Sequence, residues 1–282
     1  MKNTILLVDD VRINLEILKK ILDGSYDVLC AESGKEAIKI VQSMHVDLVL
    51  LDIMMPDVDG YEVCHTIKHN KKTKDIPVIF VTSKVDEASI VKGYDIGAVD
   101  YITKPYKKKE LVAKIKTHLK IKKLIEELEY IATHDTMTGA LNRRQFFKLA
   151  IEKFNEDDNI YGVMIDIDKF KNINDTYGHH IGDIVIKTFA KITKNTINGI
   201  FGRLGGEEFG IICDENEISK LDILRQKIEN LIIEDKVKFT ISIGVAKKNQ
   251  NHKNIDELLH DADLNLYEAK GSGRNKIVFR RR

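Results

Sequence analysis

The sequence predicts an α/β domain and an α+β domain joined by one long helix, and three observations lead to this fold class. The 282 residues, 43% hydrophobic and 32% charged, are enough for two domains that each bury a core. Between residues 5 and 102, short apolar runs alternate with amphipathic segments, which is typical of a parallel sheet covered by helices. Residues 107–133 contain neither Gly nor Pro, and longer strands follow them.

The first domain is predicted to be doubly wound, with five strands and four helices. Strands are expected at Ile5–Val8, Val28–Ala31, Leu48–Leu51, Val78–Val81 and Tyr101–Ile102, and helices at Asn14–Asp23, Gly34–Ser43, Tyr61–His69 and Glu87–Ile96. Parallel strands bring their carboxyl ends to one edge of the sheet, and ligands bind at that edge in folds of this kind.

Residues suited to phosphate and metal chemistry follow four of these strands. Asp9 and Asp10 follow the first strand and Asp52 the third, while Thr82 and Lys104 follow the fourth and fifth. Three carboxylates at one edge repel one another unless a hard cation such as Mg²⁺ lies among them. Asp52 is then a candidate nucleophile toward a phosphoryl group, with the Lys104 ammonium offsetting charge on the transferring oxygens. Helix capping explains one of these acids but not the whole set.

This half resembles the receiver domain of bacterial response regulators, and we assign residues 1–120 to it. The motifs that carry the resemblance are Leu7-Val8-Asp9-Asp10, Asp52-Ile53-Met54-Met55-Pro56 with Asp59-Gly60, Thr82-Ser83 and Lys104-Pro105. The resemblance implies a histidine kinase or a phosphotransfer protein as the phosphate donor. The roles that it implies are phosphoacceptor for Asp52, Mg²⁺ ligand for Asp9, Asp10, Asp52 and the Met54 carbonyl, phosphate contact for Lys104, and switch pair for Thr82 and Tyr101.

Residues 107–134 are predicted to form a helical connector with two apolar stripes. The first stripe, at Val112, Ile115 and Leu119, is expected to pack on the receiver domain. The second stripe is out of phase with the first and comprises Ile121, Leu124, Leu128 and Ile131. It is typical of a coiled-coil seam between two copies of a chain. Because it covers few heptads, a rigid spacer remains the alternative.

From residue 135 the order of elements indicates an α+β domain with a central, mostly antiparallel sheet. The expected elements are a turn at Asp135–Arg143, a helix to about Phe154, a strand Tyr161–Ile167, a helix to about Asn195, a hairpin at Gly205-Gly206, a helix Leu221–Ile232, a strand Lys238–Gly244, a helix Ile255–Lys270 and a strand to Phe279.

The hairpin carries the strongest chemical signal in this half. Gly205-Gly206 indicates a tight turn with room for a ligand, and Glu207 and Glu208 follow it directly. Asp166, at the end of an earlier strand, meets these acids if the two strands are neighbours. Three such carboxylates make a site for Mg²⁺ in an in-line attack on phosphorus.

Four further residues have the chemistry to bind a guanine nucleotide. Asn174 and Asp183 carry the donor and acceptor groups that pair with the edge of guanine, and Lys270 and Arg274, at i and i+4 near a helix end, suit terminal phosphates. Taken alone, Asn174 and Asp183 fit turn or cap residues better, and Lys270 and Arg274 fit solvated charges at a helix end better. Their combination with the hairpin acids favours a nucleotide site.

This half resembles the GGDEF domain of diguanylate cyclases, over residues 135–282. The signature appears as Gly205-Gly206-Glu207-Glu208-Phe209, and the family's Asp-x-Leu-Thr-Gly motif as Asp135-Thr136-Met137-Thr138-Gly139. The resemblance implies a palm-like nucleotide-cyclase fold and the joining of two GTP into cyclic di-GMP with release of pyrophosphate. The roles that it implies are Mg²⁺ binding by Asp166, the Ile167 carbonyl and Glu207 or Glu208, guanine recognition by Asn174 and Asp183, and phosphate contacts by Lys171, His179, Lys270 and Arg274.

One departure from the family pattern concerns product inhibition. The family's inhibitory site is an Arg-x-x-Asp motif upstream of the signature, and the matching positions here are Thr196-Ile197-Asn198-Gly199. Neither charge is present, so nothing at these positions clamps a phosphate or binds guanine with a carboxylate. We expect this inhibitory site to be absent.

Together these features predict a phosphorylation-controlled diguanylate cyclase that acts as a homodimer, because each domain holds only one GTP. A catalytically idle GTP-binding scaffold under receiver control is the alternative. The net charge of +1 argues against a nucleic-acid partner, and no apolar run approaches the ~20 residues that span a bilayer. Three scattered cysteines, expected to be buried, and an N-terminus without signal-peptide features indicate a cytoplasmic protein.

Overall fold

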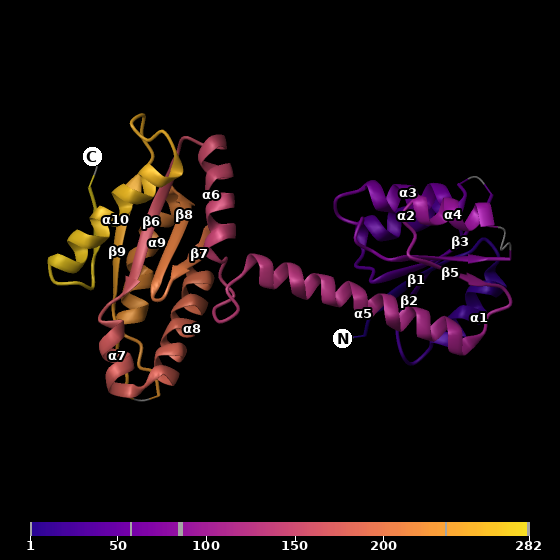
Figure 1. Cartoon of the computed structure of the whole chain (residues 1–282), viewed down its shortest axis with the longest axis horizontal. Helices are drawn as coiled ribbons and strands as arrows, with labels where there is room; N and C mark the ends of the chain where they lie inside the picture. Colours follow the sequence, from indigo (N-terminus) through magenta and orange to yellow (C-terminus); the bar gives the residue numbers. More distant parts are fainter. Residues whose placement is uncertain (1, 57, 84–86, 235, 281–282) are drawn as a thin grey trace. The chain divides into compact units, whose positions relative to one another are not determined.

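The computed structural model describes residues 2–56, 58–83, 87–234 and 236–280. The chain divides into two compact units, one that ends at Leu128 and one that begins at Glu129, and each has its own hydrophobic cores (Figure 1). Of the helices in the described ranges, none is long and apolar enough to cross a membrane.

The first unit is a five-stranded parallel sheet in the order β2-β1-β3-β4-β5 (Figure 1). Every strand pair in it is parallel, which confirms the predicted doubly wound fold. Its elements are β1 (Thr4–Val8), α1 (Arg12–Leu22), β2 (Asp27–Ala31), α2 (Gly34–Ser43), β3 (Leu48–Asp52), α3 (Gly60–His69), β4 (Val78–Thr82), α4 (Glu87–Asp95) and β5 (Asp100–Thr103).

Two cores cover the two faces of this sheet. Because side chains alternate along a strand, Leu6 and Val8 of β1 pack with α2 and α3, whereas Ile5 and Leu7 pack with α1 and α5 (Lys108–Thr133). Strand β3 is buried along its whole length. The three central strands, β1, β3 and β4, are therefore buried where they reach the carboxyl edge of the sheet.

Helix α5 changes its exposed face near Leu119, as the two apolar stripes predict. Leu111, Ile115 and Leu119 are buried in the first unit. Ion pairs from Lys114 to Asp100 and from Lys122 to Asp47 tie the helix to the same unit, at N···O distances of 2.6 and 3.0 Å. His118 Nε2 also lies 3.0 Å from Asp100 Oδ2. The apolar side chains beyond Leu119 are 45–66% exposed: Ile121, Leu124, Ile125, Leu128 and Ile131.

The second unit is a five-stranded sheet in the order β10-β9-β6-β8-β7. Only the β9–β10 pair is parallel, which confirms a mostly antiparallel sheet. Its elements are α6 (Arg143–Glu156), β6 (Ile160–Ile167), α7 (Phe170–Tyr177), α8 (His179–Thr196), β7 (Ile200–Gly205), β8 (Glu208–Asp214), α9 (Glu215–Glu229), β9 (Ile241–Lys247), α10 (Ile255–Gly271) and β10 (Ile277–Phe279).

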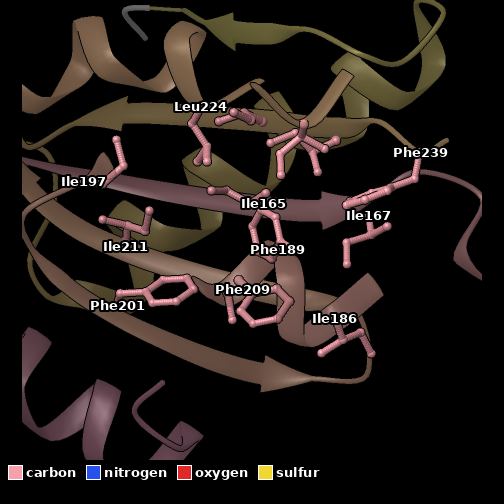
Figure 2. Close-up of a cluster of buried hydrophobic side chains, with 14 of the residues drawn as sticks. Ile165, Ile167, Ile186, Phe189, Ile197, Phe201, Phe209, Ile211, Leu224 and Phe239 are labelled. Carbon is pink, nitrogen blue, oxygen red and sulfur yellow. The ribbon is translucent and has the colours of Figure 1, made fainter. Parts of the chain in front are cut away.

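Aromatic packing holds the strands that carry the hairpin. Phe209 of β8 contacts Phe189 of α8 and Phe201 of β7, with ring centroids 4.7 and 5.5 Å apart. Figure 2 shows these rings beside Ile165 of β6 and Ile211 of β8 in the core that α8 and α9 cover. A second core, with Phe146 of α6 and Leu258 of α10, covers the other face. Strands β6 and β8 are therefore fixed from both sides.

Helix α7 is absent from the sequence-based prediction. Its residues are mostly polar and include two Asn and one Asp, so local propensity does not favour a helix there. Tertiary packing supplies the stability instead, because Ile173 is buried in the core that α8 helps to build.

Three other predicted features were placed wrongly. Strand β9 begins at Ile241 rather than Lys238, although the Thr240 carbonyl before it still accepts a hydrogen bond from the Asp168 N–H, at 2.9 Å. Helix α9 begins at Glu215 rather than Leu221, consistent with acidic residues in its first turn. Of the three cysteines, Cys64 and Cys213 are buried as expected, but Cys30 is only partly buried.

Candidate functional site

The first unit gathers three acids at the carboxyl edge of its sheet. Oxygen atoms of Asp9, Asp10 and Asp52 lie within 4.8 Å of one another, and within the described ranges no other such three-acid group occurs. Asp9 and Asp52 are buried, whereas Asp10 is exposed. Carboxylate oxygens in this number and spacing fit a hard divalent cation such as Mg²⁺.

Lys104 is bound to this acid group. Its Nζ lies 2.8 Å from Asp9 Oδ2 and 2.7 Å from Asp52 Oδ2. Burial raises the pKa of Asp52, which the hydrogen bond and charge of Lys104 oppose and the charge of Asp9 reinforces. Burial alone would lower the pKa of Lys104, but its hydrogen bonds to Asp52 and Asp9 outweigh that effect and the pKa is raised. Lys104 therefore stays cationic beside the predicted phosphoacceptor.

The two predicted switch residues lie on neighbouring strands beside a small cavity. Thr82 ends β4 and Tyr101 lies in β5, and both line a cavity of about 20 Å³ together with Ile53 and Phe80. The Tyr101 ring meets Tyr94 edge-on at 6.5 Å. The predicted ligand Met54 has an exposed side chain, and its backbone N–H donates to Asp52 Oδ1 at 3.3 Å.

Two residues near the acids were missed by the sequence analysis. Asn14 Nδ2 donates to both oxygens of Asp9, at 2.9 and 3.0 Å. The Tyr106 hydroxyl is buried and has no hydrogen-bond partner among the described residues, and burial raises its pKa to about 12. Position offered a signal for Tyr106, since it follows Lys104-Pro105 directly. No local pattern indicated Asn14.

In the second unit the signature forms the predicted hairpin between β7 and β8. Gly205 ends β7, and Gly206 and Glu207 form the turn, where Gly206 has the left-handed φ of 48° that favours glycine. Arg203 donates from Nε to the Gly206 carbonyl at 2.9 Å and from Nη1 to both oxygens of Asp135 at 3.2 Å. The motif that begins at Asp135 is thereby tied to the tip of the hairpin.

Strand pairing places Asp166 beside the hairpin, as predicted, but the carboxylates of Asp166, Glu207 and Glu208 do not form a group with oxygens within 4.8 Å of one another, as the acids of the first unit do. Asp166 of β6 lies directly opposite Glu208 of β8. Lys270 Nζ forms an ion pair with Asp166 Oδ2 at 2.8 Å. Burial raises the pKa of Asp166 to about 6; Lys270 opposes this shift, and the charges of Glu207 and Glu208 add to it. A buried acid next to two further acids is a site where a divalent cation relieves repulsion.

The predicted guanine-binding pair lies on α7 and α8. Asn174 Oδ1 is buried without a hydrogen-bond partner within the described part of the chain. A Cβ added to Gly182 would lie 1.9 Å from this oxygen, so the amide of Asn174 packs against the turn of α8 that carries Asp183. The predicted phosphate contacts Lys171, on α7, and His179, the first residue of α8, are both exposed.

The other two predicted phosphate contacts lie at the end of α10. The helix ends at Gly271, one residue beyond the predicted end, so Lys270 lies in its last turn and Arg274 lies outside it. Arg274 lies instead in the turn after the helix, with a left-handed φ of 62° and its N–H bonded to the Ala269 carbonyl. The reason is local, because Gly271-Ser272-Gly273 stops the helix before Arg274 is reached.

Comparison with known proteins places both units in described families. Residues 132–276 match the family described as "Diguanylate cyclase, GGDEF domain", and residues 5–116 match the response regulator receiver domain. The response regulator PleD of Caulobacter vibrioides is 31% identical over 269 residues, which cover 88% of this chain and 59% of PleD. The chain thus spans less than two thirds of that relative. Diguanylate cyclase A of Treponema denticola is 30% identical, with 93% of this chain and 77% of the relative covered.

A solved structure has the same fold as the second unit. The crystal structure of the coiled coil and GGDEF domain of DgcB from Caulobacter crescentus in complex with c-di-GMP matches with a TM-score of 0.55. The two sequences are 24% identical, and the match covers 61% of this chain and 98% of that one. At this identity the likeness supports the fold alone.

The raised pKa of Asp166 predicts how stability varies with pH. Between about pH 4 and pH 6 the folded chain binds this proton more tightly than the unfolded chain, so unfolding free energy falls as pH rises through that window. The rise of the Asp166 pKa to about 6 lowers the unfolding free energy by roughly 3 kcal/mol across this window. In metal-free buffer at pH 8, Asp166→Asn should therefore raise the melting temperature, and the gain should vanish near pH 4.

Thermal melts across pH, with and without Mg²⁺, test this prediction. Mg²⁺ should stabilise the wild type at pH 8 and have little effect on Asp166→Asn. Glu152→Gln, which changes an exposed acid on α6, serves as the control and should leave both melts unchanged. A lower melting temperature for Asp166→Asn at pH 8 without metal would contradict the assignment.

Proposed function

Because the chain belongs to the GGDEF family of diguanylate cyclases and carries a response regulator receiver domain, we propose that it condenses two GTP into cyclic di-GMP and pyrophosphate. The observation that carries the proposal is the meeting of Asp166 with Glu208 at the tip of the signature hairpin, with Lys270 bound to Asp166. The receiver in the same chain is proposed to control this activity.

The chain's own residues divide into three roles. Asn174 and Asp183 bind the guanine edge, consistent with the buried Oδ1 of Asn174, which has no hydrogen-bond partner among the described residues. The turn at Gly205 and Gly206 leaves room for the nucleotide, since a Cβ on either glycine would meet no atom within 4 Å. The residues proposed to bind the phosphates are Lys171, His179, Lys270 and Arg274.

The acids hold the reacting groups. Asp166, the Ile167 carbonyl and Glu207 or Glu208 would hold a divalent cation, which when bound supplies positive charge to the phosphate oxygens. One of the two glutamates accepts the proton of the attacking 3′-hydroxyl. Each of the two 3′-oxygens forms a bond to the α-phosphorus of the other GTP, and each α-phosphorus loses its bond to pyrophosphate, so that two pyrophosphates are released.

The reaction requires two copies of the domain, because each hydroxyl must face the other nucleotide's α-phosphate. The exposed stripe on α5 is the proposed contact between copies. Its residues follow heptad spacing, with Ile121 and Leu128 one heptad apart and Leu124 and Ile131 one heptad apart. Intrahelical ion pairs flank the stripe, from Lys122 to Glu126 and from Lys123 to Glu127.

Phosphorylation of Asp52 by a kinase or phosphotransfer protein is proposed to shift the chain toward this pairing. The modification replaces the carboxylate, which carries one negative charge and is bound to Lys104, with an acyl phosphate that carries about −1.5 to −2 charges. Thr82 and Tyr101, which are proposed to rearrange in response, line the same small cavity. Control therefore acts on the proximity of two domains rather than on the chemistry within one.

Cyclic di-GMP formation from GTP and Mg²⁺ is the direct test. The wild type should form product, and beryllofluoride, which mimics the phosphoryl group on Asp52, should raise the rate. Glu207→Ala should lower the rate roughly 10²-fold or more, because it removes a candidate base and cation ligand. Asp52→Asn should retain basal activity and lose the response to beryllofluoride.

Glu152→Ala, which removes an exposed acid on α6, is the matched control and should behave as the wild type. If the chain binds GTP but forms no product at any protein concentration, the proposed cyclase activity is wrong and the catalytically idle GTP-binding scaffold is favoured. Equal rates with and without beryllofluoride would contradict the proposed control of the activity by the receiver domain.

Disrupting the α5 stripe should weaken association. Leu128 is 66% exposed, so Leu128→Glu should leave the fold intact while placing like charges opposite each other in a dimer. Sedimentation velocity with beryllofluoride should show less dimer, and specific activity should fall most at low protein concentration. Ile13→Glu replaces a 63% exposed residue of α1 and is the control. Equal loss in both variants would count against the stripe.

The inhibitory product site is proposed to be missing. Thr196 ends α8, and a Cβ on Gly199 would lie 2.6 Å from the Ile212 carbonyl, so an aspartate does not fit there without movement of the strand. Added cyclic di-GMP should therefore inhibit only by competing with GTP. Initial rates at saturating GTP should be unaffected by product, and inhibition that persists there would overturn this prediction.

A further inference from the structure

Asp168 is a buried acid to which neither the sequence motifs nor the proposed reaction assigns a role. It follows β6, two residues after Asp166, and is 6% exposed. Thr240 donates its hydroxyl to Asp168 Oδ2 at 2.7 Å, and Ser242 donates its hydroxyl to Oδ1 at 2.6 Å. The third donor is the backbone N–H of Asn275, at 3.1 Å from Oδ2.

These partners bind Asp168 as a fixed acceptor. A carboxylate accepts hydrogen bonds through two oxygens, and here neutral donors occupy both. Ser242 is fully buried in β9. The Asp168 carboxylate is therefore hydrogen-bonded to the sheet through Ser242 and to the turn after α10 through Asn275. Burying a charge in this way is costly unless the donors hold it, which makes their loss a large perturbation.

The turn that Asp168 holds has an unusual backbone. Gly273, Arg274 and Asn275 follow one another with φ values of 111°, 62° and 47°. Left-handed conformations at two consecutive non-glycine residues are unfavourable and persist only where surrounding contacts impose them. The hydrogen bond from the Asn275 N–H to Asp168 is one such contact.

A second set of contacts holds the same turn from α9. Asn275 Nδ2 donates to Glu229 Oε1 at 2.8 Å, and Arg225 Nη1 donates to Asn275 Oδ1 at 3.1 Å. Arg225 and Glu229 are themselves paired at 2.8 Å. Asn275 is thus clamped through its backbone by Asp168 and through its side chain by α9.

The end of β6 therefore grips this segment at two points. Asp166 holds Lys270, just before the turn, and Asp168 holds Asn275, just after Arg274. Lys270, which Asp166 binds, and Arg274, which lies between Lys270 and Asn275, are the two side chains proposed to bind the phosphates of GTP. The carboxylates of Asp166 and Asp168, two residues apart in the chain, therefore fix where these two side chains lie relative to the hairpin acids.

We propose that Asp168 is a positioning residue that holds the turn at residues 271–276, and so places Arg274 and Lys270 for the phosphate chain of the nucleotide. This inference rests on the proposed function for its ligand, a guanosine triphosphate. It assigns Asp168 no contact with the substrate or with a cation.

Binding of 3′-deoxy-GTP tests the role without turnover, because this nucleotide lacks the attacking hydroxyl. Isothermal titration in Mg²⁺ buffer compares it with GMP, which retains the guanine contacts but lacks the terminal phosphates. Asp168→Ala should weaken 3′-deoxy-GTP binding about tenfold or more and change GMP binding less than twofold. The loss in kcat/KM for GTP should approach roughly 10²-fold, because misplaced groups lose both binding and orientation.

Three further variants separate positioning from folding. Asp168→Asn retains an acceptor oxygen and should rescue part of the loss. Asn275→Gly keeps the left-handed backbone and the N–H to Asp168 but loses both α9 contacts, so its effect should be intermediate. Thr193→Ala removes a buried hydroxyl that donates to the Phe189 carbonyl inside α8, at 2.9 Å, and serves as the structural control.

The inference is overturned if Asp168→Ala binds 3′-deoxy-GTP as the wild type does. It is equally overturned if binding of both nucleotides and the melting temperature fall together, as they would for general destabilisation. A wild type that binds 3′-deoxy-GTP but forms no product from GTP would refute the cyclase and leave this test standing. A wild type that binds neither nucleotide would overturn both proposals.

Discussion

The pairing of β6 with β8 on one side and with β9 on the other is the constraint on which the second unit depends. Side chains alternate along a strand, so a slip of one residue would turn Asp166 to the opposite face and away from Glu208. The register is held by apolar packing, since Ile165 and Phe209 are paired and both fully buried. Figure 2 shows these two residues in the core covered by α8 and α9. Hydrophobic packing thereby decides which carboxylates meet.

In both units a buried carboxylate at the end of a strand is paired with a lysine. Each buries an acid at the end of a strand, where burial raises its pKa, and each sets a lysine on that acid. Lys104 bridges Asp9 and Asp52 in the first unit, and Lys270 binds Asp166 in the second. A cation near the acid keeps the charged form accessible despite the loss of solvent. Such a site suits a divalent cation and phosphate oxygens. Both proposed reactions, phosphorylation of Asp52 and cyclic di-GMP formation, involve these two groups.

Helix α5 separates the structural requirements of folding from those of control. Its first half is committed to the first unit through Leu111, Ile115 and Leu119 and through ion pairs to Asp100 and Asp47. Beyond Leu119 the apolar side chains have no role in either core, and the division between the units falls within this part of the helix. Residues that fold neither unit are free to serve association. The change of phase near Leu119 thus marks the place where packing within one chain ends.

Local patterns in the sequence determined the two folds and most of the motif residues, because strand alternation, helix periodicity and paired glycines act over a few neighbouring positions. The acids that end strands and the hairpin at Gly206 belong to this group. Only the tertiary structure decided the existence of α7, the left-handed turn at Arg274 and the grip of Asp168 on Asn275. The partners of Asp168 lie 72, 74 and 107 residues away in the chain, so no local pattern contains them. Contacts over such separations form only when the strands and helices pack. These contacts fix the positions of side chains that the sequence motifs identify but do not locate.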